Sequence, residues 1–249
     1  MTEQRTLSGT FATQVTAARS RFAGWQYAQL AVLFPIFLLL LPFLKHALLA
    51  KAILTLLLLN IMLVADSAQP SARFIKPIGW ALWSMSSLGM LLDELHLQND
   101  AFALHFKLVG MGAHTLLVAM CAASILSVVF RSARVTLDGI FASVVSYQLL
   151  GLFFAQIYTM LLVANPTSLH LPESIEPSGE PLQLEMIYFS FVTLATLGYG
   201  DIIPDTNFAR SITIIEAIIG QFYVAVVVAV LVSAFVAQRL TELAERRRE

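Results

Sequence analysis

The sequence is poor in charge and in cysteine. Of its 249 residues, 12% are charged and 58% are hydrophobic, whereas soluble domains carry about 25% charged residues. Composition therefore excludes an ordinary soluble globule and a disordered chain. The single cysteine, Cys121, excludes an intrachain disulfide framework and a zinc site built from cysteines. The net charge of −1 lacks the basic field that nucleic-acid binding needs, so no nucleic-acid partner is expected.

Long apolar runs make up much of the sequence. A membrane-spanning helix needs about 20 mostly apolar residues. Runs of this kind cover residues 27–44, 46–65, 74–92, 108–130, 140–163 and 212–237. We therefore predict an all-α membrane protein with six transmembrane helices and no internal repeat. The first 25 residues are polar and mixed, and we do not expect them to be a secretory signal.

The placement of basic and acidic residues predicts the orientation in the membrane. If both termini are cytoplasmic, most arginines and lysines fall in cytoplasmic segments, as the positive-inside rule requires. The acidic residues on the other side would be Asp93, Glu94, Asp100, Glu173, Glu176, Glu180, Glu185, Asp201 and Asp205. We therefore expect a multi-pass protein of the cell membrane, plasma or inner, surrounded by lipid and with both termini in the cytoplasm.

The segment between the fifth and sixth runs holds a shorter apolar stretch. Residues 182–194 are too few to cross a bilayer, which indicates a re-entrant or buried helix. The chain continues as TLGYGD, residues 196–201. Irregular backbone survives at membrane depth only where protein covers it or where it lines a water-filled path. We therefore expect this loop to line such a path.

The pattern Thr193-x-x-Thr196-x-Gly198-Tyr199-Gly200-Asp201 resembles the signature of potassium channels. In such channels, rings of backbone carbonyls from four copies replace the hydration shell of the ion. Successive carbonyls face one axis only where the backbone alternates into the left-handed region, which glycine adopts without steric cost.

The resemblance implies a homotetramer around a central pore, with a re-entrant pore helix before the filter. It implies K⁺ as the permeant ion and no organic cofactor. Ion-binding residues would be Thr196, Leu197, Gly198, Tyr199 and Gly200, with K⁺ at the carbonyls of the first four. The residues that support the filter would be Thr193, Tyr188 and Asp201.

Positions that depart from the family pattern include Leu197, Tyr188 and Phe189. Leu197 replaces the commoner valine but still contributes a carbonyl. Tyr188 and Phe189 stand where many members carry two tryptophans. Tyr188 could hydrogen-bond Asp201, whereas Phe189 has no donor to offer Tyr199.

Two residues in the last apolar run, Gly220 and Glu216, are unfavourable inside a membrane-spanning helix and therefore require an explanation. Gly220 lies 19 residues after Asp201, where the family's inner helix usually carries a gating hinge. Glycine inside a helix costs about 1 kcal/mol relative to alanine, which either bending or close packing against the short helix would explain. Glu216 is an ionisable residue inside a membrane span. It could serve gating or pH sensing, or bond hydroxyls of the short helix such as that of Thr193.

The resemblance is strong over the pore region and only architectural before it. We predict a four-helix domain over residues 1–136, in the position of a voltage sensor, and a pore domain over residues 137–249. A voltage sensor needs several arginines or lysines within its fourth span, and the run 108–130 contains none. Steep voltage gating is therefore not expected.

These observations favour a potassium-selective channel that conducts passively. A non-selective cation channel is the nearest alternative, because the aromatic surroundings of the filter are altered. A potassium transporter subunit is a further alternative, although such proteins usually carry several degenerate filter loops in one chain. An enzyme is not expected, because the sequence has no H-x-x-x-H metal pair and no G-x-S-x-G nucleophile motif.

Overall fold

The computed structural model describes residues 26–40, 43, 47–68, 75–94, 101–131, 136–172 and 182–246. Its helices are α2 (Gln26–Leu40), α3 (Ala47–Ala68), α4 (Ile75–Glu94), α5 (Ala101–Arg131), α6 (Leu137–Ala164), α7 (Leu182–Leu194) and α8 (Asn207–Arg246). Both chain termini lie outside the described residues, as do Asp100, Glu173, Glu176 and Glu180 of the predicted outer acidic group.

Among the described elements, the one that is not helical is a small sheet of two strands with two residues in each strand. β1 (Leu169–His170) pairs antiparallel with β2 (Ile203–Pro204), and Leu169 lies opposite Pro204. The all-α expectation missed it because two-residue strands leave no periodic signal. The sheet ties the start of the loop after α6 to the end of the loop before α8.

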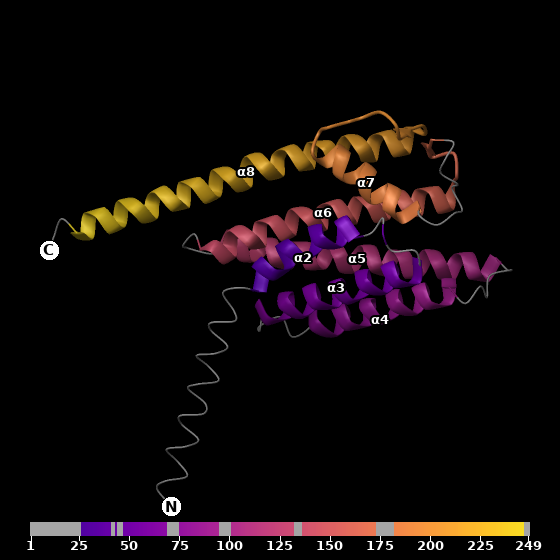
Figure 1. Cartoon of the computed structure of the whole chain (residues 1–249), viewed down its shortest axis with the longest axis horizontal. Coiled ribbons are helices and arrows are strands. Elements are labelled where there is room, and N and C mark those ends of the chain that lie inside the picture. Colours follow the sequence, from indigo (N-terminus) through magenta and orange to yellow (C-terminus); the bar gives the residue numbers. More distant parts are fainter. Residues whose placement is uncertain are drawn as a thin grey trace, which may run out of the picture.

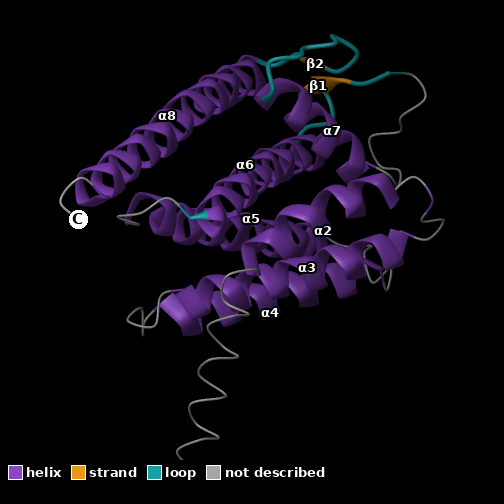
Figure 2. Ribbon diagram, turned by 60° about the vertical axis from the view of Figure 1, so that its left-hand side comes forward, coloured by secondary structure: helices purple, strands orange, loops and turns teal. Residues whose placement is uncertain are grey.

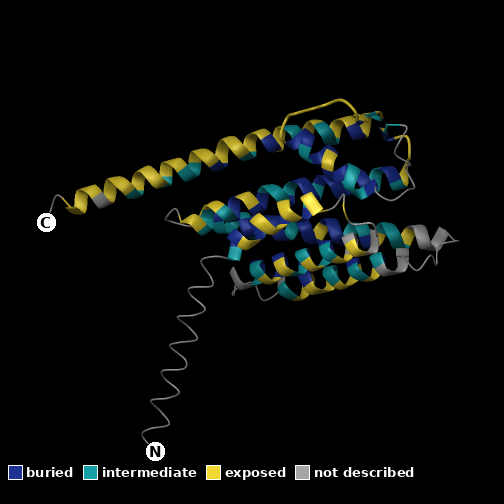
Figure 3. Ribbon diagram, viewed as in Figure 1, coloured by how far each residue is buried: buried dark blue, intermediate teal, exposed yellow. Residues whose placement is uncertain are grey.

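The helices form a bundle from which α8 departs. α5 packs along α4 on one side and α6 on the other, and α2 lies against α6. α8 contacts α7 and α6 near its N-terminal end and then diverges from the bundle (Figures 1 and 2). Most of α8 is consequently exposed in the single chain (Figure 3).

Every predicted apolar run forms a helix, but their lengths differ. Within the part of the chain that the structure describes, three helices are long and apolar enough to cross a membrane, namely His105–Phe130 within α5, α6 and α8. The 15 residues of α2 extend about 22 Å at 1.5 Å per residue, short of a hydrocarbon core of about 30 Å. α8 continues beyond the predicted run at both ends, because residues 238–246 contain no glycine or proline and are mostly good helix formers.

α6 is the helix around which the others pack. Thr136 caps its N-terminus by accepting a hydrogen bond from the Gly139 N–H at 3.1 Å. Its buried residues, which include Leu149, Phe154 and Tyr158, face several neighbouring helices at once. A helix that is apolar on most of its faces is expected at the centre of a membrane bundle.

A proline in α2 leaves a carbonyl of that helix free to bond α6. Pro35 has no N–H, so the carbonyl of Ala31, four residues earlier, loses its helical donor. Gln148 on α6 donates its Nε2–H to that carbonyl at 3.2 Å. The neighbouring Phe34 packs against Phe191 of α7, with ring centroids 5.9 Å apart. The first described helix is thus anchored to the same helices that hold the TLGYGD loop.

Candidate functional site

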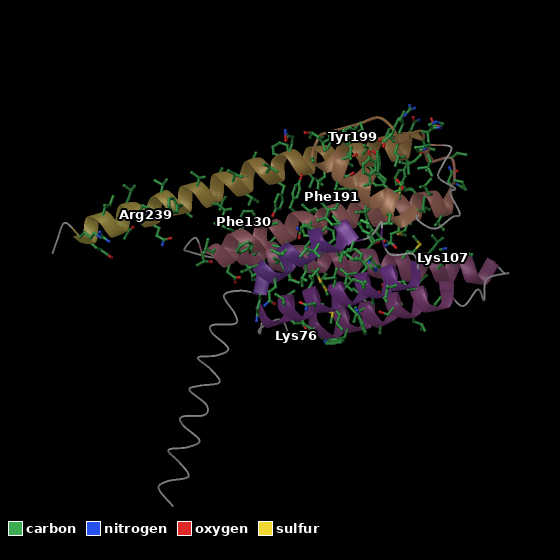
Figure 4. All side chains as sticks on the ribbon, viewed as in Figure 1. Lys76, Lys107, Phe130, Phe191, Tyr199 and Arg239 are labelled. Atoms are coloured by element: carbon green, nitrogen blue, oxygen red, sulfur yellow. The ribbon has the colours of Figure 1, made fainter. Side chains whose placement is uncertain are left out.

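The short helix α7 has the extent that the sequence predicts, and it lies between α6 and α8. Glycine on α6 makes room for it, because a Cβ at Gly151 would lie 2.6 Å from the Phe191 ring. Figure 4 shows Phe191 directed from α7 toward α6. Met186 and Ser190 are fully buried. α7 is therefore a packed internal helix and not an exposed connection.

The last carbonyls of α7 bind the chain that follows. The Val192 carbonyl accepts from the Leu197 N–H at 2.8 Å, and the Thr193 carbonyl accepts from the Thr196 N–H at 2.9 Å. The Leu194 carbonyl accepts from the Tyr147 hydroxyl of α6 at 3.2 Å. The negative end of the α7 dipole therefore lies at the start of the TLGYGD loop.

The backbone of the TLGYGD loop alternates in handedness. The φ angles are +60° at Thr196, +58° at Gly198 and +79° at Gly200, whereas Leu197 and Tyr199 have ordinary negative φ. Both glycines lie in the left-handed region, as the prediction required. Sequence reasoning did not assign Thr196 to that region, because a non-glycine residue there is strained. Every second residue from 196 to 200 is therefore left-handed.

Large apolar side chains of this loop are exposed in the single chain. Leu197 is 59% exposed and Tyr199 is 67% exposed. Figure 4 places Tyr199 on the loop beside α8, at the edge of the molecule. Large apolar side chains that are exposed on a loop with this alternating backbone indicate a surface that other protein covers.

A tyrosine from α7 holds the end of the loop. The Tyr188 hydroxyl donates to Asp201 Oδ2 at 2.7 Å, the hydrogen bond that the sequence allowed. This bond lowers the pKa of Asp201 and raises the pKa of Tyr188 to about 12. The Tyr188 ring stacks on Tyr199 at 6.4 Å between centroids. Phe189 instead packs edge-on against Tyr158 of α6 at 4.9 Å.

Glu216 of α8 is completely buried behind α7. Its two carboxyl oxygens lie 2.5 Å from the Ser190 hydroxyl and 2.5 Å from the Tyr158 hydroxyl. Sequence analysis named Thr193 as the example of a hydroxyl partner, but Ser190, one turn earlier on α7, takes this place. Which hydroxyl of α7 bonds Glu216 depends on the position of α8 along α7. Only the packing of the two helices determines that position.

At Gly220, α8 packs closely against the end of α7. A Cβ at this position would run into the carbonyl oxygen of Leu194. The close-packing explanation for this glycine therefore has a named contact, while its role as a hinge stays a prediction. α8 itself is one helix from Asn207 to Arg246.

Three tyrosines contribute contacts that sequence reasoning missed. Tyr147 bonds α7, Tyr158 bonds Glu216, and the Tyr223 hydroxyl of α8 donates to the Ser143 carbonyl of α6 at 2.6 Å. The Tyr147 and Tyr223 rings also pack together at 5.4 Å. The available signal was a polar-tipped aromatic inside an apolar run, because a buried tyrosine hydroxyl usually finds a partner.

Comparison with known proteins assigns the class of this molecule. Residues 151–237 match the ion channel family. The chain is 36% identical over 97 residues to Protein LctB of Geobacillus stearothermophilus and to Protein LctB of Bacillus caldotenax, covering 38% of this chain and 71% of each relative. It is 39% identical over 67 residues to the voltage-gated potassium channel Kch of Escherichia coli strain K12, covering 27% of this chain and 16% of Kch. No solved structure matches at a significant level.

The matched stretch contains the end of α6, α7, the TLGYGD loop and most of α8. The protein is therefore a membrane-embedded ion channel and not an enzyme. It belongs to the same family as Protein LctB, and a 67-residue stretch of it is similar to a potassium channel.

Proposed function

We propose that this protein conducts K⁺ passively and selectively through a filter built from four copies of the TLGYGD loop. The observation that carries the proposal is the alternating left-handed backbone at Thr196, Gly198 and Gly200, directly after a buried short helix. That alternation is what allows successive carbonyls to point to one axis, where they can replace the water around a dehydrated K⁺.

In this proposal each residue of the loop has a role. The carbonyls of Thr196, Leu197, Gly198 and Tyr199 form the K⁺ sites, and Gly200 completes the turn out of the filter. The Thr196 hydroxyl adds the innermost ring. Support comes from the contacts of α7, namely the Thr193 carbonyl to the Thr196 N–H and the Tyr188 hydroxyl to Asp201.

A homotetramer follows from the proposal, because one chain provides one loop. The exposed apolar face of α8 supports this assembly. The exposed large apolar side chains on its first half include Phe208, Ile214, Ile215, Ile218, Ile219 and Phe222. In four copies, these helices would meet around the axis as inner helices, and residues 137–249 would form the pore domain. Residues 1–136 would form a peripheral domain, with both termini in the cytoplasm and the loop facing outward across the cell membrane.

A non-selective cation channel is the second candidate. The observation in its favour is the orientation of Phe189, which packs on Tyr158 and leaves Tyr199 stacked against Tyr188. Family members with two tryptophans have two aromatic donors at these positions. A less rigid ring around the filter would discriminate less well between K⁺ and Na⁺.

Reversal potentials separate the two candidates. Purified protein in planar bilayers, with K⁺ in excess on one side, Na⁺ in excess on the other and some K⁺ on both, should carry a current that reverses near the K⁺ equilibrium potential. A reversal potential near zero under the same gradient would favour the non-selective channel. The absence of any current, in preparations shown by mass to be assembled, would contradict both.

A further inference from the structure

Three short oxygen–oxygen contacts connect α6, α7 and α8 behind the TLGYGD loop. Ser190 Oγ lies 2.7 Å from the Gly151 carbonyl oxygen and 2.5 Å from Glu216 Oε1. Tyr158 Oη lies 2.5 Å from Glu216 Oε2. We call the Glu216 carboxyl, the Ser190 and Tyr158 hydroxyls and the Gly151 carbonyl the carboxyl cluster. Its two hydroxyl-bearing side chains and its carboxyl are all buried.

The number of protons in the carboxyl cluster can be counted. Each short contact between two oxygens needs one proton between them, so three contacts need three protons. Ser190 and Tyr158 carry one hydroxyl proton each, and a carbonyl carries none. The third proton can come only from the Glu216 carboxyl. With it, Glu216 donates to Ser190, Ser190 donates to Gly151, and Tyr158 donates to the other carboxyl oxygen.

The charges around Glu216 agree with this count. Among the described residues, no lysine, arginine or histidine lies within ion-pair distance of its carboxyl, and an isolated buried charge is very costly. The titratable groups that face it are Tyr158 and Tyr147, both on α6. α7 presents Ser190. On α8 itself, Thr213 gives its own proton to the Ala209 carbonyl and lies 3.3 Å from the Tyr158 hydroxyl.

We propose that Glu216 is a neutral carboxylic acid whose proton leaves the Ser190 hydroxyl free to bond the Gly151 carbonyl and so locks α7 to α6, and that loss of this proton releases the lock. Without the proton, the carboxylate would take the Ser190 hydroxyl as donor. The contact between Ser190 and Gly151 would then have no proton. The lock is therefore closed at low pH and opens as pH rises.

The position of the carboxyl cluster gives the lock a consequence for the pore. α7 carries the TLGYGD loop, and α8 contacts α7 at the cluster and, one turn further along, at Gly220 against Leu194. Release of the contact between Ser190 and Gly151 would change how α7 is seated on α6 while its two contacts with α8 remain. The effect on current rests on the function proposed above, whereas the protonation of Glu216 does not.

Infrared spectroscopy of the reconstituted wild-type channel tests the protonation directly. We expect a carboxylic-acid C=O band at neutral pH that is missing from Glu216→Gln and that disappears from the wild type as pH is raised. Ser190→Ala should shift the band without removing it, because the acid proton loses its acceptor. Glu245→Gln, on the exposed end of the same helix, should leave the band unchanged. A wild-type spectrum that matches Glu216→Gln at every pH would overturn the proposal.

The pH dependence of ion flux into vesicles tests the lock. A glutamine at 216 can donate to Ser190 and accept from Tyr158 as the neutral acid does, but it cannot titrate. We expect the wild-type flux to change as pH rises and the Glu216→Gln flux to stay at the low-pH wild-type value, with Glu245→Gln following the wild type. Equal pH profiles for wild type and Glu216→Gln would refute the lock. Loss of K⁺ selectivity with the infrared band intact would refute the proposed function alone.

Discussion

Backbone handedness at single residues carries the main functional argument. Thr196 has a φ of +60°, which is strained for a residue other than glycine. The N–H groups of Thr196 and Leu197 hold it there, because they bond the carbonyls of Thr193 and Val192 at the end of α7. Gly198 and Gly200 meet the same requirement at no steric cost, with open space where a Cβ would stand. The alternation is therefore a property of local chain geometry that the α7 end holds in place.

Gly198→Ala tests this geometry. A Cβ there would meet no atom within 4 Å, so any effect comes from the φ of +58° and not from crowding. A left-handed alanine costs about 1–2 kcal/mol, and a tetramer would carry that cost four times. We expect loss of K⁺ selectivity or of current with membrane insertion intact, measured by reversal potential and protein yield.

Gly112→Ala on α5 is the matched control for this variant, since a Cβ there also meets nothing within 4 Å but the backbone is helical. It should leave selectivity unchanged. An unaltered preference for K⁺ over Na⁺ in Gly198→Ala would mean that the TLGYGD loop is not the filter.

Tyr188→Phe tests the support of Asp201. The Tyr188 hydrogen bond lowers the pKa of Asp201, so this bond contributes stability above the ordinary aspartate pKa and loses it as pH falls through the lowered value. Without the hydroxyl, Asp201 should take up its proton at higher pH. We expect the midpoint of current loss in acid to move upward in Tyr188→Phe. Asp201→Asn should show no such midpoint, and equal midpoints for wild type and Tyr188→Phe would contradict the role.

At the scale of helices, α7 and α8 meet at few places. Gly220 touches the Leu194 carbonyl, and Glu216 bonds Ser190. α6 supports both helices through tyrosine hydroxyls that reach the Leu194 carbonyl and Glu216. The seat of α7 on α8 therefore depends on small and polar side chains, which have few alternative arrangements, whereas its apolar side chains pack mainly against α6 and α2.

Gly220→Ala distinguishes close packing from mere flexibility. In an open helix position, alanine stabilises by about 1 kcal/mol relative to glycine, as we expect for Gly112→Ala. At 220 the methyl would collide with backbone, and overpacking of this kind costs about 1–3 kcal/mol. We expect a lower melting temperature for Gly220→Ala in detergent than for wild type. An equal or higher melting temperature would mean that α7 and α8 separate at this point.

The charge content of α5 predicts weak voltage dependence. Residues 108–130 contain no lysine, arginine, aspartate or glutamate, and each charge that crosses the field contributes about 2.3 kcal/mol per 100 mV. We expect shallow activation in current–voltage records, in contrast to what the name of the relative Kch implies for that protein. A gating charge of several elementary units would contradict this prediction.

At the scale of the whole molecule, the single chain leaves a large apolar surface uncovered. Its TLGYGD loop and most of α8 are exposed (Figure 3). The exposed side chains of α8 are largely apolar, and the loop is built around backbone carbonyls. A helix that leaves its own bundle with bare isoleucine, valine and phenylalanine needs lipid or other copies to cover it. Four copies would cover α8 and bring four loops to one axis.

The mass of the assembly tests this arrangement. Native mass spectrometry of the protein released from detergent should give four times the 27.4 kDa of one chain. The same sample after denaturation should give the mass of one chain. A monomer or dimer in a sample that conducts K⁺ would rule out the filter as proposed, since one or two loops cannot form a closed ring of carbonyls.

The sequence alone predicted the helices around the site and the loop itself. Hydrophobic length identified the six apolar helices, and the short run 182–194 predicted α7 to the residue. TLGYGD indicated its own backbone, since glycine at alternate positions permits left-handed turns. These properties are local, so neighbouring residues in the chain are enough to determine them.

Only the tertiary structure decided which side chains meet. Ser190 and not Thr193 bonds Glu216, Phe189 faces Tyr158, and Gly220 lies on the Leu194 carbonyl. Each of these contacts joins separate helices, and its partner changes when one helix slides or rotates by a single turn. Apolar periodicity leaves that register open, because many apolar faces pack about equally well. It is fixed by the close fit of small residues and the few buried hydroxyls that must each find a partner.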